Sequence, residues 1–156
     1  MISQAQIGKV ARRYHLDLIV LFGSRAKGHA RASSDVDVAV RAFKPGWIGK
    51  RRVPRWKWNL DVIGAVSSAV DDRRDVDVAF LNRATPLFMF EVARYGKLLY
   101  ERKSGDFAVF RSYAARRYDD NAKFFWLTRQ YLEKHFGTPG PKTRRAKTGE
   151  SPKISR

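Results

Sequence analysis

The sequence predicts an α/β (α+β) fold in which a small mixed sheet is flanked by helices and followed by a long C-terminal helix. Residues 18–22, 35–40 and 75–81 have the apolar or alternating patterns of β-strands. Residues 3–14 and 58–70 carry apolar residues at helical spacing. The same spacing continues over the whole of residues 104–135, which predicts the long final helix.

Length and composition divide the chain into three parts. Its 156 residues, 44% of them hydrophobic, can bury a sizeable core. We expect a first domain over residues 1–102 and a helical extension over residues 103–137 that packs on this domain or on a partner. Residues 138–156 hold three of the six prolines and almost no apolar side chain, so we expect a disordered basic tail.

Charge and cysteine content restrict the environment and the partners. The chain has no cysteine, so it has no disulfide and no thiolate zinc site. No apolar run approaches the length of a membrane span and no signal peptide is recognisable, so we expect a cytoplasmic protein without a membrane partner. The net charge of +17 favours polyanionic partners but identifies none of them.

The N-terminal segment is predicted to be a helix that packs on the sheet. Ile7, Val10, Ala11 and Tyr14 fall on one helical face within residues 3–14. His15 follows at the turn into the first strand. A single histidine without a nearby polar partner is expected to be structural rather than catalytic.

The first strand ends in a turn that points to a phosphate. Residues 18–22 form an unbroken apolar run, and Gly23 ends it. Ser24 is predicted to be the N-cap of a short helix over residues 25–28. The free N–H groups at such a helix start can hold an anionic phosphate, although a lone Gly-Ser after a strand is also an ordinary turn.

The second strand carries a pair of carboxylates. Side chains alternate along a strand, so Asp35 and Asp37 share one face, while Val36, Val38 and Val40 face the core. Two neighbouring carboxylates repel one another unless a cation lies between them, and their hard oxygen ligands suit Mg²⁺. The alternative is a solvated strand face.

Residues 41–57 are predicted to be a loop, because Pro45-Gly46 and Pro54 interrupt them. The segment contains seven basic residues, no acidic residue and two tryptophans, Trp47 and Trp56. Basic and aromatic side chains together can bind a nucleic acid. The segment can equally be a solvated loop whose tryptophans pack against the domain, or it can contact the nucleotide or a protein partner.

The next two elements include another strand that carries two aspartates. Residues 58–70 have the spacing of a helix, and residues 75–81 that of a strand after a polar turn at residues 71–74. Asp75 and Asp77 share a face of this strand. Asp77 is the stronger candidate for the site because it lies deeper in the strand, whereas Asp75 is beside the turn.

The last predicted elements are a helix, an edge strand and the long helix. Thr85 and Pro86 have the residue types of an N-cap and a first helical position, and Gly96 is expected to end this helix after Tyr95. Residues 97–101 follow as a short strand. The many aromatic residues of the final helix either cover the core or form a protein interface.

The turn and the carboxylates together resemble a known family. Gly23-Ser24-Arg25-Ala26 with Gly28, followed by Ser34-Asp35-Val36-Asp37, resembles the minimal nucleotidyltransferase (MNT) family of the DNA polymerase β-like superfamily. The resemblance implies a polymerase β-like nucleotidyltransferase fold over the first domain. It also places Asp77 as the third carboxylate of the site.

The resemblance further implies an activity, cofactors and partners. Asp35, Asp37 and Asp77 would hold two Mg²⁺ ions as the catalytic residues, and Gly23, Ser24 and Arg25 would bind the phosphates of ATP. MNT proteins commonly act as antitoxins that adenylylate a tyrosine of a partner HEPN ribonuclease toxin. Two alternatives stay open: a nucleotidyltransferase acting on RNA, such as a tRNA 3′ end, and a non-catalytic binding antitoxin.

Overall fold

The computed structural model describes residues 2–28, 35–70 and 75–136, which fall into two units, Met1–Ala122 and Lys123–Arg156. The predicted turn at residues 71–74, Ser34 of the motif and the basic tail lie outside the described residues. No helix in the described part is long and apolar enough to cross a membrane. The first unit contains the sheet and every element that positions the candidate site.

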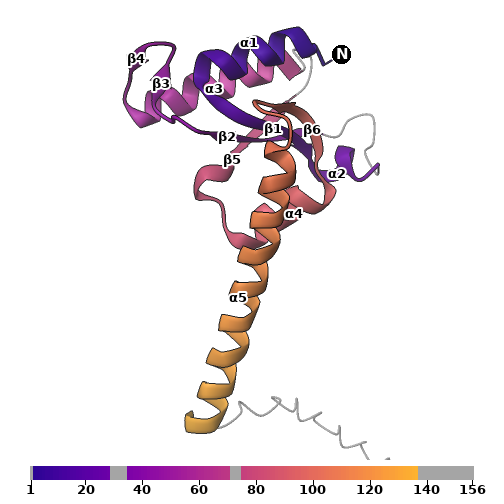
Figure 1. The fold of residues 1–156 in the computed structure, drawn as a ribbon, viewed down its shortest axis with the longest axis vertical. Coiled ribbons are helices and arrows are strands. Elements are labelled where there is room, and N and C mark those ends of the chain that lie inside the picture. The colour runs from indigo at the N-terminus through magenta and orange to yellow at the C-terminus, as the bar shows by residue number, and fades with distance from the viewer. Residues whose placement is uncertain (1, 29–34, 71–74, 137–156) are drawn as a thin grey trace, which may run out of the picture. The chain divides into compact units, whose positions relative to one another are not determined.

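A four-stranded mixed sheet lies at the centre of the first unit (Figure 1). Its strands are β1 (Leu16–Phe22), β2 (Val36–Ala42), β5 (Val76–Phe80) and β6 (Lys97–Glu101), in the order β5-β2-β1-β6. Strand β1 is antiparallel to β2 and β6, whereas β2 and β5 are parallel. The predicted mixed sheet is confirmed, and β6 is an edge strand as expected.

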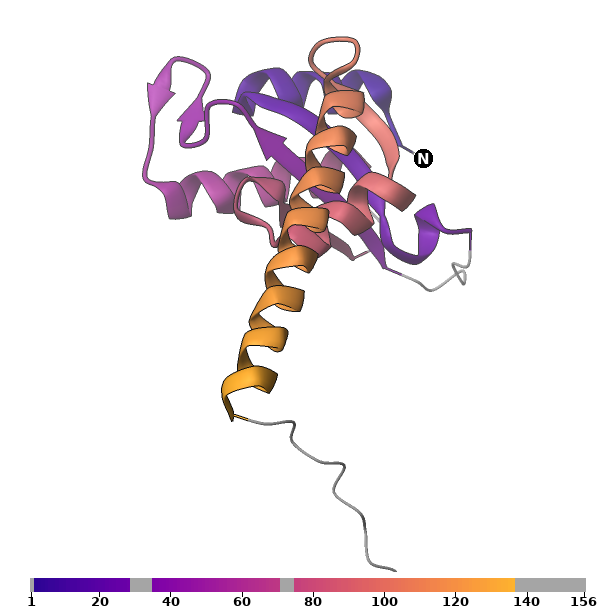
Figure 2. The ribbon, with the colours of Figure 1, turned by 60° about the horizontal axis from the view of Figure 1, so that its bottom comes forward.

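Two helices cover one face of the sheet (Figures 1 and 2). They are α1 (Gln4–Tyr14) and α3 (Arg55–Val70). Their apolar side chains form one core cluster with the predicted inward face of β2, namely Val36, Val38 and Val40. The N-cap of α1 is Ser3, whose hydroxyl accepts from the N–H of Gln6 at 3.5 Å. Helix α3 begins at Arg55, earlier than the predicted start at Trp58.

The other face is covered by α4 (Pro86–Tyr95) and the first part of α5 (Asp106–Phe136). Here a second core cluster joins residues of β1 and β2 to residues of the two helices: Leu18, Val20, Ala39, Met89, Val92, Phe110 and Ala114. Thr85 is the predicted N-cap and accepts from the N–H of Phe88 at 3.3 Å. The apolar positions of the final helix that lie in this unit therefore pack on the domain core only in part, since Tyr113 is exposed.

Gly96 ends α4, but not through the left-handed conformation that is usual for a glycine after a helix. Its φ of −68° is not left-handed, so the usual glycine cap is absent. A Cβ at this position would collide with the side chain of Val20 and the carbonyl oxygen of Val92. Glycine is needed because the backbone of residue 96 passes close to β1.

The segment predicted as a loop contains a hairpin, so that prediction was wrong in part. Strands β3 (Trp47–Ile48) and β4 (Arg51–Arg52) form a separate two-stranded sheet. Gly49 supplies a positive φ at the turn between them. Its N–H donates to the carbonyl of Arg13 at 2.8 Å, and its carbonyl lies 2.7 Å from Nε2 of His15. His15 thus makes a structural contact that holds the hairpin against the end of α1.

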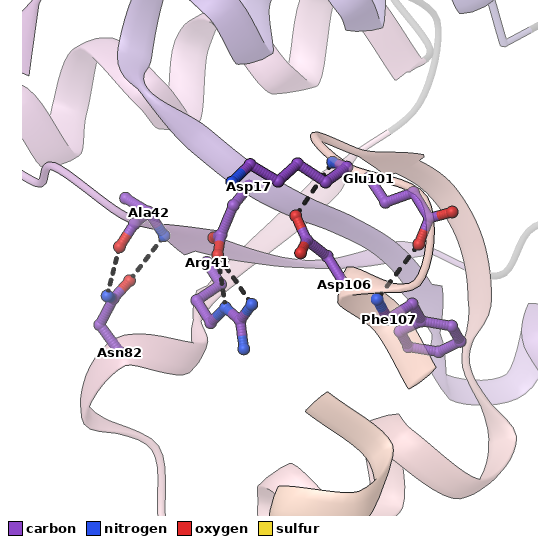
Figure 3. Close-up of polar contacts among 8 residues, drawn as sticks. Asp17, Arg41, Ala42, Asn82, Glu101, Asp106 and Phe107 are labelled. Carbon is purple, nitrogen blue, oxygen red and sulfur yellow. Dashed lines mark hydrogen bonds and ion pairs between the residues drawn. The ribbon is translucent and has the colours of Figure 1, made fainter. Parts of the chain in front are cut away.

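Polar contacts tie the sheet to the segments around it (Figure 3). The side-chain amide of Asn82, in the short helix η1 (Leu81–Arg83) after β5, donates to the carbonyl of Ala42 at 2.8 Å. Its side-chain oxygen accepts from the N–H of the same residue at 2.9 Å. Arg41 pairs with Asp17 at 2.7 Å, and both side chains are largely buried. The ends of β1, β2 and β5 are therefore fixed by side chains as well as by the ladder.

The start of α5 is held by two carboxylates (Figure 3). Asp106 accepts from the N–H of Lys103 at 3.0 Å, and Glu101 accepts from the N–H of Phe107 at 3.1 Å. Negative charge beside the first turn of a helix satisfies free N–H groups and complements the helix dipole. The helix begins at Asp106 rather than at the predicted residue 104.

The second unit, described over residues 123–136, is the C-terminal part of α5. Large apolar side chains on this segment are 48–64% exposed: Phe124, Phe125, Trp126, Leu127, Tyr131 and Leu132. Arg129 and Glu133 form an exposed i,i+4 ion pair, with 2.8 Å between Nε and Oε1. An apolar surface of this kind on a polar helix is typical of a protein interface.

Candidate active site

The strand register brings two of the three predicted carboxylates side by side. Asp37 of β2 and Asp77 of β5 are directly paired in the parallel ladder. Paired residues of neighbouring strands project from the same face of a sheet. Asp35 comes directly before β2 and is exposed, as is Asp77, whereas Asp37 is half-buried.

These carboxylates are close enough to influence one another. Burial raises the pKa of Asp37 above its ordinary value of 3.8, and the negative charges of Asp77 and then Asp35 raise it further. The three predicted carboxylates therefore lie close enough together to interact electrostatically at one part of the sheet. The arrangement is unfavourable for the chain itself and would be relieved by a bound cation.

The donor set fits a hard cation, although the side chains are not closed around one. Carboxylate oxygens are the ligands that Mg²⁺ prefers. Within the described ranges, no group of three or more acidic, histidine or cysteine side chains is already arranged to hold a metal ion. Asp37 and Asp77 are positioned by the ladder, and Asp35 would have to turn toward them.

Gly23 brings the turn after β1 against the same carboxylates. Phe22 pairs with Asp37 across the antiparallel ladder, and Gly23 follows with a φ of +72°. A Cβ at residue 23 would overlap the carboxylate of Asp37, with its Cγ 2.9 Å away. Only glycine allows both the left-handed backbone and this close approach.

The predicted cap at Ser24 is wrong. The short helix α2 spans Gly23–Ala26, and its N-cap position is Phe22, with no side-chain capping bond. The chain turns at Gly23 itself because glycine tolerates the positive φ, so Ser24 lies inside the turn. Its hydroxyl is therefore not used as a cap for this helix.

Arg25 connects the turn to the start of the second strand. Its Nε–H donates to the carbonyl of Asp35 at 3.3 Å, and the side chain is partly buried. Gly23, Ser24 and Arg25 are thus consecutive in α2 and lie beside the strand that carries Asp35 and Asp37. The predicted phosphate-binding and carboxylate residues come from neighbouring elements of one end of the sheet.

Lys27 is a residue of this region that sequence reasoning missed. Its ammonium group lies 3.2 Å from Glu91 and 4.4 Å from the centre of the Tyr95 ring, both on α4. These contacts hold the turn that contains Gly23 against helix α4. No local pattern identifies Lys27, because Glu91 is 64 positions further along the chain.

Sequence comparison shows that the chain is similar to a known protein. A curated relative, the protein adenylyltransferase MntA of Aphanizomenon flos-aquae (strain 2012/KM1/D3), is 32% identical over 99 residues. The match covers 62% of this chain and 65% of the relative, so this chain spans just under two thirds of the relative's length.

Solved structures share the fold. A chain from the crystal structure of a toxin–antitoxin complex with AMP-PNP is 25% identical, with a TM-score of 0.55, over 85% of this chain and 97% of that one. A chain from a mutant MntA toxin–antitoxin complex is also 25% identical, with a TM-score of 0.58, over 86% and 97%.

The family comparison covers the whole sheet and both parts of the motif. The family described as Polymerase beta, Nucleotidyltransferase matches residues 5–105, which run from α1 to the loop before α5. This range includes Gly23 and all three carboxylates. The chain therefore belongs to the polymerase β nucleotidyltransferase family, as its Gly-Ser turn and Asp-x-Asp strand predicted.

Proposed function

We propose that the protein transfers AMP from ATP to a hydroxyl group of a partner protein, and that this partner is a HEPN-family toxin. The observation that carries the proposal is the pairing of Asp37 with Asp77 against the Gly23 turn. A nucleotidyltransferase acts on a triphosphate. It therefore needs carboxylates that hold metal ions and a backbone that comes close to the triphosphate, and both must lie at one place.

Each residue of the site has a proposed role. Gly23 lets the backbone approach the triphosphate, Ser24 donates a hydrogen bond to a phosphate oxygen, and Arg25 contacts a phosphate. Asp35, Asp37 and Asp77 would hold two Mg²⁺ ions, which when bound neutralise charge on the α-phosphate and activate the attacking hydroxyl. The hydroxyl oxygen bonds to the α-phosphorus, pyrophosphate leaves, and Asp77 takes the proton of the hydroxyl.

The choice of ATP and of a protein acceptor rests on the relatives. One similar structure is a toxin–antitoxin complex with AMP-PNP, and the curated relative is named a protein adenylyltransferase. The exposed apolar residues of the second unit supply a surface on which a protein can dock. The tyrosine acceptor comes from the family resemblance.

Mass spectrometry of the partner tests the proposal. The neighbouring genes are searched for a HEPN protein, the chain is incubated with ATP, Mg²⁺ and the HEPN protein found there, and the intact mass of that protein is measured. We expect one or more AMP units on a tyrosine, located by fragmentation, and none with Asp77→Asn. The control Asp119→Asn removes an exposed carboxylate from α5 and should leave the transfer unchanged.

The same reaction mixture separates the remaining alternatives. If tRNA added to the mixture takes the label from α-³²P-ATP while the HEPN protein stays unmodified, the acceptor is RNA. If neither is labelled although the HEPN protein binds, the chain is a non-catalytic binding antitoxin. Both results would overturn the proposed protein transfer.

A further inference from the structure

A cavity lined by arginines lies at the end of the sheet away from the candidate active site. Its volume is about 490 Å³, and three of its lining residues are Arg52 of β4, Arg55 at the start of α3 and Arg83 of η1. Its other walls are largely apolar, formed by Pro45, Val53 and Pro54. Arg52 and Arg55 come from two neighbouring elements, and Arg83 joins them from a distant part of the sequence.

The three arginines are not neutralised by the protein in the part of the chain that is described. The ion pairs found there are Lys27–Glu91, Arg41–Asp17 and Arg129–Glu133, and none of them involves a cavity arginine. Residues 43–57 contain no acidic residue at all. Gathering like charges in one cavity is unfavourable unless an anion binds there.

Hydrogen bonds to the backbone hold the walls of the cavity in place. The two hydrogen bonds of Asn82 to Ala42 position the neighbouring Arg83 beside the end of β2. The N–H of Val53 donates to the carbonyl of Gly46 at 2.9 Å and closes the hairpin that carries Arg52. The arginines thus project from anchored backbone rather than from a free loop.

The cavity is a separate site from the carboxylates. Strands β2 and β5 run parallel, with Asp37 and Asp77 near their first residues and the cavity beyond their last residues. From Asp37 to Ala42 a strand spans about 16 Å at ~3.3 Å per residue. Open sheets commonly bind ligands beyond the carboxyl ends of parallel strands, which is where the cavity lies.

The chemistry of the walls indicates what the anion is. Guanidinium groups match the geometry of phosphate oxygens and bind them with paired hydrogen bonds. Trp56 follows Arg55 in the sequence and is 67% exposed, so its ring is available to a ligand that extends beyond the cavity. A phosphate site next to an exposed aromatic ring is the arrangement by which proteins hold single-stranded nucleic acid.

We propose that this cavity binds a phosphodiester group of single-stranded RNA, and that Trp56 stacks on an adjacent base. The site does not depend on the proposed transfer reaction, because it shares no residue with it. A free nucleotide or inorganic phosphate presents the same phosphate chemistry, and the experiment therefore includes both.

The experiment measures binding of a fluorescein-labelled single-stranded RNA oligonucleotide to the full chain by anisotropy at several salt concentrations. The test variant is Arg52→Gln with Arg83→Gln. The matched control is Lys50→Gln with Arg51→Gln, which removes two charges from the same hairpin but leaves the cavity intact. A third variant, Trp56→Ala, tests stacking, and circular dichroism confirms that all variants are folded.

We expect the cavity variant to lose about tenfold or more in affinity for the RNA. Because two phosphate contacts are lost, the slope of log affinity against log salt concentration should become shallower by about 1.4. The control should lose less than about threefold and Trp56→Ala about tenfold. Equal losses for the cavity variant and the control would mean that RNA is attracted only by net charge, which overturns the proposal.

Competition identifies the source of the phosphate. Millimolar AMP or inorganic phosphate should not displace the RNA if the cavity needs a nucleic-acid strand with its stacked base. If either displaces the RNA from the wild type, or binds the wild type but not the cavity variant by calorimetry, the cavity is a small-anion site and the RNA proposal is wrong.

Discussion

Two features require glycine at position 23, the left-handed backbone and the close approach to Asp37, and mutations can separate them. Gly23→Ala adds a Cβ in a left-handed conformation, which costs about 1–2 kcal/mol, and also drives this atom into the carboxylate of Asp37. Gly28→Ala is the matched control, because Gly28 also has a positive φ, of 77°, but no atom within 4 Å of the added Cβ.

We therefore expect both variants to lose stability, and Gly23→Ala to lose more. AMP transfer should fall at least about 100-fold for Gly23→Ala, since the displaced carboxylate no longer lies beside the turn, and stay within a few-fold for Gly28→Ala. Denaturant unfolding and the transfer assay check the two effects. Equal activity of the two variants would show that the contact with Asp37 is unimportant.

Asp37 is predicted to lower the stability of the free protein. Because its pKa is raised in the fold, the native state releases this proton less readily than the unfolded chain does. The free energy of unfolding therefore falls as pH rises from the ordinary aspartate range through the raised pKa, and it stays lower at neutral pH.

Asp37→Asn should consequently raise the melting temperature at pH 7 by about 1–3 °C, a small gain because charges at a partly exposed site are screened. The difference from the wild type should vanish in acid, below the ordinary pKa of aspartate. Scanning calorimetry at several pH values checks this, and a variant less stable than the wild type at pH 7 contradicts it. Added Mg²⁺ should stabilise the wild type and have little effect on the variant.

At the scale of elements, α3 fixes the hairpin through one side chain. Trp58 is fully buried, and its indole N–H donates to the carbonyl of Trp47 in β3 at 2.9 Å. Trp58→Phe should cost about 2–3 kcal/mol, because it leaves a cavity and an unpaired carbonyl.

Trp56→Phe is the control for this prediction, since Trp56 is on the same helix but mostly exposed, and its change should cost less than about 0.5 kcal/mol. Chemical denaturation gives both values. Hydrogen exchange of the hairpin amides should rise only for Trp58→Phe. Similar losses of stability in the two variants would remove the proposed anchor.

The elements also show what sequence can predict. The faces of α1 and β2 follow from apolar spacing within a few residues, and so both were predicted correctly. The hairpin was missed because its anchors, the carbonyl of Arg13 and the ring of His15, lie far from Gly49 in the sequence. The early start of α3 was missed because Pro54 is compatible both with a loop and with the position before a helix.

The same distinction applies to the candidate site. The alternation of residues predicts that Asp35 and Asp37 share a face, and a family resemblance adds Asp77. The contact of Asp37 with Gly23, the partners of Lys27 and the place of Arg83 in the cavity depend on long-range packing. The cap expected at Ser24 fails because Gly23 can turn the chain without it.

At the scale of the whole molecule, the apolar residues of the second unit are predicted to bind the partner protein. Leu127→Asp with Tyr131→Asp places charges within this surface and should weaken a complex with the HEPN protein at least about 100-fold, since such surfaces bind by burying apolar area. Lys134→Asp is the control, because it adds an aspartate at an exposed polar position of the same segment.

Co-purification and calorimetry measure the effect, and labelling of the partner should fall in parallel. Binding of ATP by the free chain should be unchanged, because residues 127 and 131 belong to a different unit from the candidate active site. Full binding by the double variant would assign the partner surface to another part of the chain.

The two hydrogen bonds of Asn82 gain importance from a repetition in the sequence. Residues 35–39 and 75–79 are both Asp-Val-Asp-Val-Ala, and β5 is an edge strand with β2 as its single neighbour in the sheet. Sliding β5 by two residues would keep every side chain on its own face and would set Asp75, instead of Asp77, opposite Asp37. The Asp-Val-Asp-Val-Ala pattern alone does not distinguish the two alignments, although the slide would move Phe80 away from its ring contact with Trp58. In the observed alignment Asn82 bonds to both backbone groups of Ala42 at the far end of the strand, and these bonds help to hold Asp77, rather than Asp75, opposite Asp37.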